Sequence, residues 1–358
     1  MCLVRRSHAW PALVGLLWLG GCWARGPAGE GRDRTGPGAR RAQAVVVYVS
    51  LDEPYASPVF EAFTRDLGIP VRPVFDSEAH KSRGLAQRLL SERNRPRADV
   101  FWSSEVLQMV RLAAEGVLDP YRCPTAEGIP ARYRDPQDRW VGFAGRFRVL
   151  ACNPQRLREE GLPLPKSLLE LTHPRWKGKT ALANPLFGTT TTEAAALFQV
   201  LGRRRAEEYF RARAANDPRV VDGNSPAAEA AARGDVPVAQ TDTDDAYVRQ
   251  AGGAALEVVF PDQDTLGALL IPNTAAAIRD GPSPQLARQF LDYLLRPETE
   301  LMLAALPSRQ LPLHPGLEDR LPATVRPLAR VRVMDVDYSR LAEQHWEMDA
   351  LLRELFLR

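Results

Sequence analysis

The sequence alternates short apolar segments with amphipathic ones, and this alternation constrains the fold more than any other feature. Val45 to Val49 is β-branched and predicts a buried strand, whereas residues 58–66 have helical spacing and precede Gly68, a residue typical of helix C-termini. Two further pairs of strand and helix follow, at 71–75 and 85–93 and at 98–102 and 106–115. Because strands separated by helices pair in parallel, the sequence predicts an α/β fold.

The alternation begins again after about Ser167, which predicts a second α/β lobe. Single cores stop growing near ~250–300 residues, so a chain of 358 residues fits two lobes. We place the first lobe at about 44–145 plus part of the C-terminal half, and the second at about 146–272. The expected strands are 147–151, 180–183, 236–240 and 256–260, and the expected helices are 192–202, 285–295 and 338–357.

The composition and charge of the chain exclude a disordered chain, a coiled coil and a polytopic membrane protein. Apolar residues make up 45% and charged residues 25%, which is ordinary globular composition. The 47 basic and 44 acidic residues leave a net charge of +3, which is too small to indicate nucleic-acid binding. We therefore expect no nucleic-acid partner, and we expect a monomer.

The N-terminal segment resembles an export signal. Arg5 and Arg6 precede an apolar run, Ala9 to Leu19, that is too short to span a bilayer as a helix. The run ends in Leu-Gly-Gly-Cys22, which resembles the lipobox of bacterial lipoproteins, whose cysteine is lipidated and becomes the mature N-terminus. An ordinary signal peptide with an incidental cysteine is the alternative.

We therefore expect a lipoprotein signal peptide at 1–22 and a disordered tether at 23–43, where Gly, Pro and Arg predominate without an apolar period. The folded part, 44–358, would then lie in the periplasm or cell envelope, anchored to the membrane by lipid. Cys123 and Cys152 are the only cysteines of that part. An oxidising compartment allows them to pair, and the sequence leaves the disulfide and two free thiols equally open.

Polar side chains follow four of the predicted strands, and ligands of open α/β sheets bind beyond the carboxyl ends of strands. The first two loops are SLDE, which contains Ser50 and Asp52, and SSE, which contains Ser104 and Glu105. Their hydroxyls and carboxylates suit a polar ligand. The alternative is helix N-capping, by Ser50 or Asp52 in the first loop and by Ser103 or Ser104 in the second, where Glu105 favours the positive N-terminal end of the helix dipole.

The third loop, FGTTTT, contains Gly188, Thr189, Thr190 and Thr191. Glycine permits a sharp turn, and free amides at a helix N-terminus together with threonine hydroxyls form an anion site. A plain threonine N-cap is the alternative.

The fourth loop, TDTDD, places Asp242, Thr243, Asp244 and Asp245 after a predicted strand. Three carboxylates in so short a segment repel one another unless a positive group lies among them. They suit a hard cation or an ammonium group, and an exposed acidic turn is the alternative.

The sequence contains no recognisable catalytic constellation. Its five histidines lack metal-ligand spacing, and no GxSxG motif is present. We therefore expect a protein that is not an enzyme and that has no catalytic residue and no cofactor.

Taken together, these segments resemble the ferric-ion-type extracellular solute-binding proteins of bacterial ABC importers. The segments that carry the resemblance are VYVSLDEPY, ADVFWSSEV, WVGFAGRFRVLACNP, NPLFGTTTT and VAQTDTDDAYV. The resemblance implies a two-lobed periplasmic-binding-protein fold with a hinge, a ligand in the cleft between the lobes, and a membrane permease that recognises the closed form.

Ferric members of this family hold iron with a histidine, a glutamate and two adjacent tyrosines, plus a synergistic anion. By resemblance Glu105 matches the glutamate, Asp52 falls near the histidine, and the tyrosine pair falls on Thr243 and Asp244. Both phenolates are therefore absent. A ferric or divalent metal ion, as transported ligand, would be held by the carboxylates of Asp52, Glu105 and Asp244.

The resemblance also implies an anion subsite. The segment from Gly188 to Thr191 matches the family's anion loop, Arg146 matches an anion-facing arginine, and Asn224 and Ser225 match another cleft segment. A ligand that carries both an amine and a phosphate or phosphonate would satisfy the acidic loop and the threonine loop at once.

The sequence thus predicts a substrate-binding lipoprotein of an ABC importer that captures a small polar solute, either a ferric or other metal ion or a phosphate- or phosphonate-type anion. Two alternatives use the same residues. One is an exported metal-dependent phosphate-handling hydrolase, and the other is a lipid-anchored ligand sensor with the same fold.

Overall fold

The computed structural model describes residues 44–76, 82–343 and 345–356. The signal peptide, the lipidation site at Cys22 and the tether that the sequence predicts lie outside these residues. Residues 42–358 form one compact unit. Among the described residues, no helix combines the length and the apolar character needed to cross a membrane.

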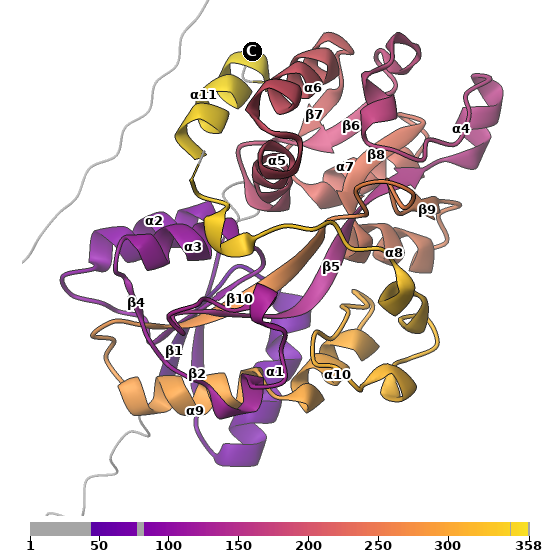
Figure 1. The fold of residues 1–358 in the computed structure, drawn as a ribbon. Helices are drawn as coiled ribbons and strands as arrows, with labels where there is room; N and C mark the ends of the chain where they lie inside the picture. Colours follow the sequence, from indigo (N-terminus) through magenta and orange to yellow (C-terminus); the bar gives the residue numbers. More distant parts are fainter. Residues whose placement is uncertain (1–43, 77–81, 344, 357–358) are drawn as a thin grey trace, which may run out of the picture. The chain divides into compact units, whose positions relative to one another are not determined.

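The described chain forms one mixed sheet of ten strands in the order β2-β1-β3-β10-β5-β8-β6-β7, with β4 beside β10 and β9 beside β5 (Figure 1). The strands are β1 (Val45–Val49), β2 (Val71–Phe75), β3 (Val100–Ser103), β4 (Leu118–Asp119), β5 (Val141–Cys152), β6 (Thr180–Ala183), β7 (Arg219–Val221), β8 (Val238–Asp242), β9 (Glu257–Val259) and β10 (Leu270–Ile278).

Pairing within the sheet defines two lobes. Strands β2-β1-β3 are parallel, as are β8-β6-β7, which the predicted alternation requires. Strands β10 and β5 run antiparallel to their neighbours, and β5 continues from one group into the other. We call the group of β1–β4 and β10 the first lobe and the group of β6–β9 the second lobe; β5 connects them.

Helices cover the sheet in both lobes (Figure 1). They are α1 (Glu53–Leu67), α2 (Arg83–Glu92), α3 (Leu107–Ala114), α4 (Pro154–Glu159), α5 (Gly188–Leu201), α6 (Arg203–Ala215), α7 (Asn224–Ala232), α8 (Thr243–Ala251), α9 (Pro284–Leu294), α10 (Pro297–Ala305) and α11 (His345–Phe356). Helix α11 packs against α5 and α6, so the final amphipathic segment closes the second lobe.

Several elements differ from the sequence-based expectation. Helix α1 begins at Glu53 and accommodates Pro58 inside it, and its C-cap is the predicted Gly68, with φ +69°. Helix α5 begins at Gly188, so the threonine loop is the first turn of a helix. Helix α11 begins only at His345, after a short 3-10 turn.

The core is aromatic where β5 enters the first lobe. Trp102 of β3 lies 5.8 Å from Phe60 of α1 and 5.7 Å from Phe143 of β5, measured between ring centroids. Phe60 in turn lies 5.9 Å from Phe290 of α9. These contacts bury large apolar surfaces and fix α1 and α9 against the sheet.

Cys123 and Cys152 are both buried free thiols, so the structure contains no disulfide between them. The Cys123 thiol donates to Oδ1 of Asp292 at 3.2 Å, in the first lobe. Cys152 is the last residue of β5 and pairs with Val238 of β8 in the second lobe. The two thiols therefore belong to different lobes, and the sequence could not show this separation.

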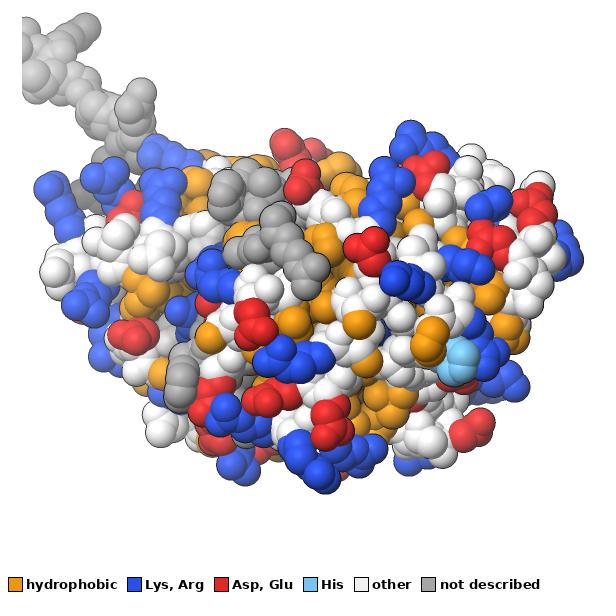
Figure 2. All heavy atoms as spheres, turned by 90° about the horizontal axis from the view of Figure 1, so that it is seen from above, with side chains coloured by type: hydrophobic (Ala, Val, Ile, Leu, Met, Phe, Trp, Pro, Cys, Tyr) orange, Lys and Arg blue, Asp and Glu red, His pale blue; other side chains and the backbone are white. Residues whose placement is uncertain are grey.

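Charged side chains of both signs are interspersed over the face of the molecule shown in Figure 2, with hydrophobic side chains between them. This distribution agrees with the small net charge of +3.

Candidate functional site

A cleft lies where the ends of strands from both lobes meet, and its empty space is ≈ 490 Å³ with the part open to solvent included. The lining is mostly polar. It consists of Asp52, Ser104, Arg146, Ala183, Asn184, Phe187, Gly188, Thr189, Asp222, Gly223, Asn224, Asp242, Asp244 and Asp245. Nine of the fifteen ligand-binding residues predicted from the sequence are among these.

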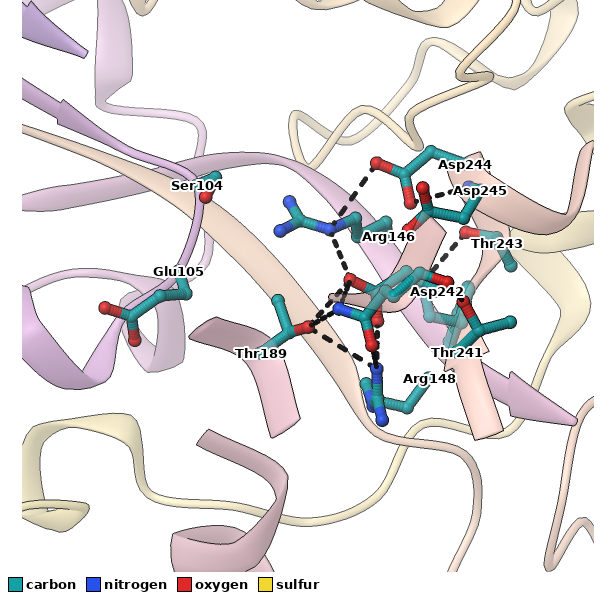
Figure 3. A network of polar contacts seen from close by, with 12 residues as sticks. Ser104, Glu105, Arg146, Arg148, Thr189, Thr241, Asp242, Thr243, Asp244 and Asp245 are labelled. Carbon is teal, nitrogen blue, oxygen red and sulfur yellow. Dashed lines mark hydrogen bonds and ion pairs between the residues drawn. The ribbon is translucent and has the colours of Figure 1, made fainter. Parts of the chain in front are cut away.

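Arg146 of β5 is the cation of the cleft (Figure 3). Its Nε lies 3.1 Å from Oδ2 of Asp242 and 3.6 Å from Oδ2 of Asp244. The side chain is almost fully buried, and its Nη1 has no hydrogen-bond partner among the described residues. A buried guanidinium N–H without a partner is costly, and because Arg146 lines the cleft, an acceptor in the cleft would remove this cost.

Arg148, two residues farther along β5, lies on the other side of Asp242 from Arg146 and is just as deeply buried (Figure 3). Its Nη1 donates to Oδ1 of Asp242 at 2.6 Å, and its Nε donates to Oε2 of Glu193 at 3.0 Å. The same Nη1 donates to Oδ1 of Asn224 at 2.8 Å. Asp242 is therefore held between two arginines, and its charge is neutralised from inside the second lobe.

The environment fixes the ionic state of this network. Burial alone would raise the pKa of Asp242, but the charges of Arg148 and Arg146 outweigh it and lower the pKa. Burial alone would lower the pKa of Arg146, but the carboxylates of Asp244 and Asp242 outweigh it and raise the pKa. Both arginines and Asp242 are therefore charged at neutral pH.

Three helices of the second lobe begin at the cleft: α5, α7 and α8. No side chain caps α5 at Phe187 or α7 at Gly223. Thr189, in the first turn of α5, turns its hydroxyl sideways and donates to Oδ2 of Asp242 at 2.8 Å. The threonine N-cap considered as an alternative is therefore not formed, and the amide ends of α5 and α7 face a polar space where negative charge is favoured.

The acidic loop forms the beginning of α8. One carboxylate oxygen from each of Asp242, Asp244 and Asp245 lies within 4.8 Å of the others. Arg146 forms ion pairs with Asp242 and Asp244. Its positive charge offsets the repulsion between the carboxylates that the sequence led us to expect. Asp52 lines the cleft from the first lobe.

The structure does not bring the predicted metal set of Asp52, Glu105 and Asp244 together. Glu105 is fully buried outside the cleft lining and accepts hydrogen bonds from the backbone amides of Leu107 and Gln108 at the beginning of α3. Its Oε2 also accepts from the Thr192 hydroxyl of α5 at 2.7 Å. Glu105 thus caps α3 itself, a role expected from the sequence for Ser103 or Ser104, and it joins the two lobes. Burial raises the pKa of Glu105, although these hydrogen bonds oppose the rise.

Five other predicted site residues lie outside the lining. The Ser50 hydroxyl bonds to the hydroxyl of Ser104, and Ser225 accepts from Arg249 at 2.7 Å. The Thr243 hydroxyl accepts from the amide of Phe147 at 3.2 Å. Thr190 and Thr191 of α5 are also absent from the lining, although the Thr190 hydroxyl donates to Oδ1 of Asn224, which lines the cleft, at 3.4 Å.

Sequence reasoning missed Arg148, Glu193 and Asp222. Arg148 carried a usable signal, because two arginines at positions i and i+2 on one face of an apolar strand require buried carboxylates. Glu193 gave no signal of its own, since it lies inside an alanine-rich helix. Asp222 follows the short edge strand β7, which the sequence did not predict.

Known proteins share this fold and part of this sequence. Iron-bound HitA from Pseudomonas aeruginosa superposes with a TM-score of 0.78 at 24% identity, covering 87% of this chain and 99% of that chain. AfuA from Actinobacillus pleuropneumoniae, solved with fructose-6-phosphate, superposes with a TM-score of 0.77 at 20% identity, covering 88% and 98%. The major ferric iron-binding protein of Neisseria meningitidis is 25% identical over 309 residues, 84% of this chain and 89% of that protein.

These neighbours share the two-lobed periplasmic-binding-protein fold, so the fold class predicted from the sequence is confirmed. The relatives are named as binding proteins, as the predicted resemblance implies. A model of the family described as bacterial extracellular solute-binding protein matches residues 96–340. The chain therefore belongs to the bacterial extracellular solute-binding proteins.

Proposed function

We propose that this chain serves an ABC importer and captures a small solute that carries both an anionic oxyacid group, such as phosphate or phosphonate, and a cationic group. The observation that carries the proposal is the buried, unpartnered Nη1 of Arg146 in a cleft where α5 and α7 begin. Three further carboxylates, those of Asp52, Asp244 and Asp245, line the same cleft.

The anionic end of the solute belongs beside Arg146. Helix N-termini and a guanidinium are the groups that proteins use for phosphate and phosphonate oxygens. Arg146 keeps its position because Asp242 holds its Nε, so Nη1 stays available for the solute. Because Asp242 is already neutralised by Arg148, it does not repel the incoming anion as a bare carboxylate would.

The cationic end belongs beside Asp244, Asp245 and Asp52. Asp244 also lies within ion-pair distance of Arg146, at 3.6 Å, so the two ends of the solute would lie close together. An ammonium group among the three would add hydrogen bonds to charged acceptors, each worth about 1.5–3 kcal/mol.

A hard metal ion is the second candidate solute. Asp242, Asp244 and Asp245 offer oxygens within 4.8 Å of one another, and hard cations prefer such ligands. The relative from Neisseria meningitidis is named as a ferric iron-binding protein. Arg146 occupies this carboxylate set, however, and a metal would have to displace it. For this reason we rank the metal second.

Calorimetric titration of residues 42–358 tests both candidates. We expect 2-aminoethylphosphonate to bind at least tenfold more tightly than inorganic phosphate or a simple alkylamine. Tight binding of ferric ion, offered as its citrate complex, with no binding of any oxyanion would favour the second candidate. Absence of heat and of thermal stabilisation with every probe, polyamines and divalent metals included, would contradict both.

Asp244→Asn separates the two ends of the solute. It should weaken 2-aminoethylphosphonate by about tenfold or more, since one charged acceptor is lost. Inorganic phosphate should bind equally or more tightly, because a repelling charge is removed. Ser225→Ala is the matched control: its hydroxyl bonds to Arg249 outside the cleft, so both affinities should stay unchanged.

The importer and the envelope location complete the proposal. Family membership supports a location outside the cytoplasm, and we propose a lipid anchor at Cys22 and delivery of the solute to a permease. Cys22→Ala in the full chain should move the protein from the membrane to the soluble envelope fraction. Unchanged membrane association would contradict the anchor.

A sensor role would use the same cleft, and uptake of labelled solute in cells with and without the chain separates it from import. For the hydrolase, the described lining supplies no histidine or cysteine. Metal-dependent turnover of phosphate esters that is abolished by Asp244→Ala would establish it instead of binding.

A further inference from the structure

Strand β5 carries one extra residue immediately before Arg146. Phe143 pairs with Asn273 of β10, and Arg146 pairs with Ile271, so three steps along β5 correspond to two steps along β10. Two residues of β5 therefore lie opposite Pro272. This is a β-bulge, a feature that often re-aims a side chain beside a functional site.

The bulge decides which face of the sheet carries the arginine. Residues directly opposite each other on antiparallel strands share a face, and so do residues two apart on one strand. Phe143 and Arg146 pair with residues two apart on β10, so they share a face although they are three apart in the sequence. In a regular strand Arg146 would instead share the face of Gly142 and would leave the cleft.

The bulge is held by bonds that a regular ladder does not provide. Ala144 has φ +42°, an uncommon value for a residue with a side chain. Its N–H donates to Oε1 of Glu300 at 2.7 Å, and its carbonyl accepts from the Asn273 amide. The N–H and the carbonyl of Gly145 both bond to the backbone of Leu311, at 2.7 Å each.

Glu300 of α10, which accepts from the Ala144 N–H, is fully buried and makes further bonds that hold it in place. Its carboxylate also accepts from the amides of Leu313 and His314, at 2.8 and 3.0 Å. The His314 ring bonds to it through Nδ1 at 2.6 Å. A buried carboxylate with four such partners is rigid, so it fixes the Ala144 N–H at one point relative to the segment after α10.

We infer that Glu300 is a positioning residue for solute binding: it holds the β5 bulge at Ala144 and thereby directs Arg146 into the cleft. The test of this inference by phosphate affinity rests on the proposed function, whereas the test by the position of Arg146 in a crystal structure does not. Glu300 itself is absent from the cleft lining, so it acts only through the bulge.

The test is a crystal structure of Glu300→Ala in residues 42–358 without solute, together with titration of inorganic phosphate. In the variant the Arg146 Nε should leave Asp242, from which it is 3.1 Å away in the wild-type chain, and phosphate affinity should fall at least tenfold. Glu300→Gln keeps an acceptor for the Ala144 N–H and should restore most of the affinity. An unchanged bulge with Arg146 in place would overturn the inference.

Asp99→Ala is the matched control. Asp99 is a buried carboxylate that accepts from the backbone amides of Val46 and Ser283, at the other end of β10. Its loss should lower the melting temperature without moving Arg146 or changing phosphate affinity. An equal loss of affinity in this variant would show that general destabilisation explains the effect.

Two outcomes remain distinct from failure of the inference. If the wild-type chain does not bind phosphate, the proposed function fails for that probe, and the position of Arg146 in the variant still decides the inference. If Glu300→Ala does not fold, Asn273→Ala removes the bond to the Ala144 carbonyl instead. It should lengthen the contact between Arg146 and Asp242, and an unchanged contact would overturn the inference.

Discussion

The two lobes contribute different kinds of polar side chain to the cleft. The second lobe supplies a network of buried charges around Asp242, with Arg146 and Arg148 from the connecting strand on either side of it. The first lobe supplies Asp52 and a cluster of neutral hydroxyls, in which Ser104 lies 3.2 Å from Ser50. The ion-paired network therefore lies on the side of the second lobe, and Asp52 is the one charged residue that the described part of the first lobe adds to the lining.

This difference indicates an order of events. Prearranged charges bind an ionic solute without further reorganisation, so the solute should dock on the second lobe before the first lobe closes over it. Hydroxyls cost less to desolvate than charged groups and form weaker hydrogen bonds to an ionic solute, so the first lobe should contribute to closure more than to recognition. Glu105, which joins α3 of the first lobe to Thr192 of the second, supports the closed arrangement.

The largest expected effect comes from Arg148, which lies beneath the charged side of the cleft. Arg148→Met leaves Asp242 and Glu193 without one buried cation, so the free energy of unfolding should fall by about 3–5 kcal/mol in urea denaturation. Solute binding should fall with it, because Asp242 would then repel an anion.

Arg213→Met is the control for that loss. Arg213 is just as buried, but it donates to the Leu171 carbonyl and the Thr180 hydroxyl. Both partners are neutral, so removing Arg213 leaves neither of them with an unpaired charge. Its loss should cost about 1–3 kcal/mol. A smaller loss for Arg148→Met than for Arg213→Met would contradict the charge network as the support of the second lobe.

The first lobe should respond more weakly. Ser104→Ala removes one hydroxyl from the cleft, and we expect the affinity for 2-aminoethylphosphonate to fall by about threefold to tenfold, the worth of roughly one hydrogen bond. Calorimetric titration measures this change directly. A loss of a hundredfold or more would show that the first lobe recognises the solute as strongly as the second does.

The buried pair of His314 and Glu300 should make stability depend on pH. Burial alone would lower the pKa of His314, but its bond to Glu300 and the charges of Glu300 and Glu298 outweigh it and raise the pKa above 6.5. The stabilisation is therefore complete below about pH 6.5 and is lost as the pH rises through the higher folded value.

His314→Asn should flatten this decline in the free energy of unfolding, measured by urea denaturation across pH 6 to 9. The exposed His173 is the control, and His173→Asn should leave the decline in place. A decline that persists unchanged in His314→Asn would assign it to another group.

The smallest effect concerns the cysteines, of which each lobe holds one. Burial raises the pKa of Cys123 to about 11 and also raises the pKa of Cys152, so both stay protonated and react slowly. A reducing agent should leave the melting temperature of residues 42–358 unchanged, and denaturation should release two titratable thiols. A lowered melting temperature in reductant would show that a disulfide joins the lobes.

Short-range sequence patterns were enough to predict much of the secondary structure of the first lobe. The β-branched run from Val45 to Val49 and the C-cap at Gly68 depend on neighbouring residues only, and both occur as the sequence indicates. Strand β10 was missed, because Pro272 interrupts it and alanines fill its second half. Its strand conformation comes from pairing with β3 and β5, which lie far away in the sequence.

The site was predictable where polar residues follow a strand and was missed where partners are distant. The acidic loop and Gly188 line the cleft as the strand ends indicated. Glu105 was assigned to a metal set, whereas in the structure it accepts from the first amides of α3, near the helix N-terminus where its charge was expected, as an alternative, from the sequence. The ion pair of Arg148 with Glu193 joins residues on β5 and α5, and only the folded chain brings them together.

The most direct test of the central claim, that the second lobe holds the anionic end of the solute through Arg146, is calorimetric titration of 2-aminoethylphosphonate into the wild-type chain and Arg146→Lys. Lysine keeps the charge beside Asp242 and Asp244 but lacks the second nitrogen that faces the cleft. We predict one solute per chain for the wild type and at least a tenfold loss of affinity in the variant. Equal affinity in the two proteins would contradict the claim.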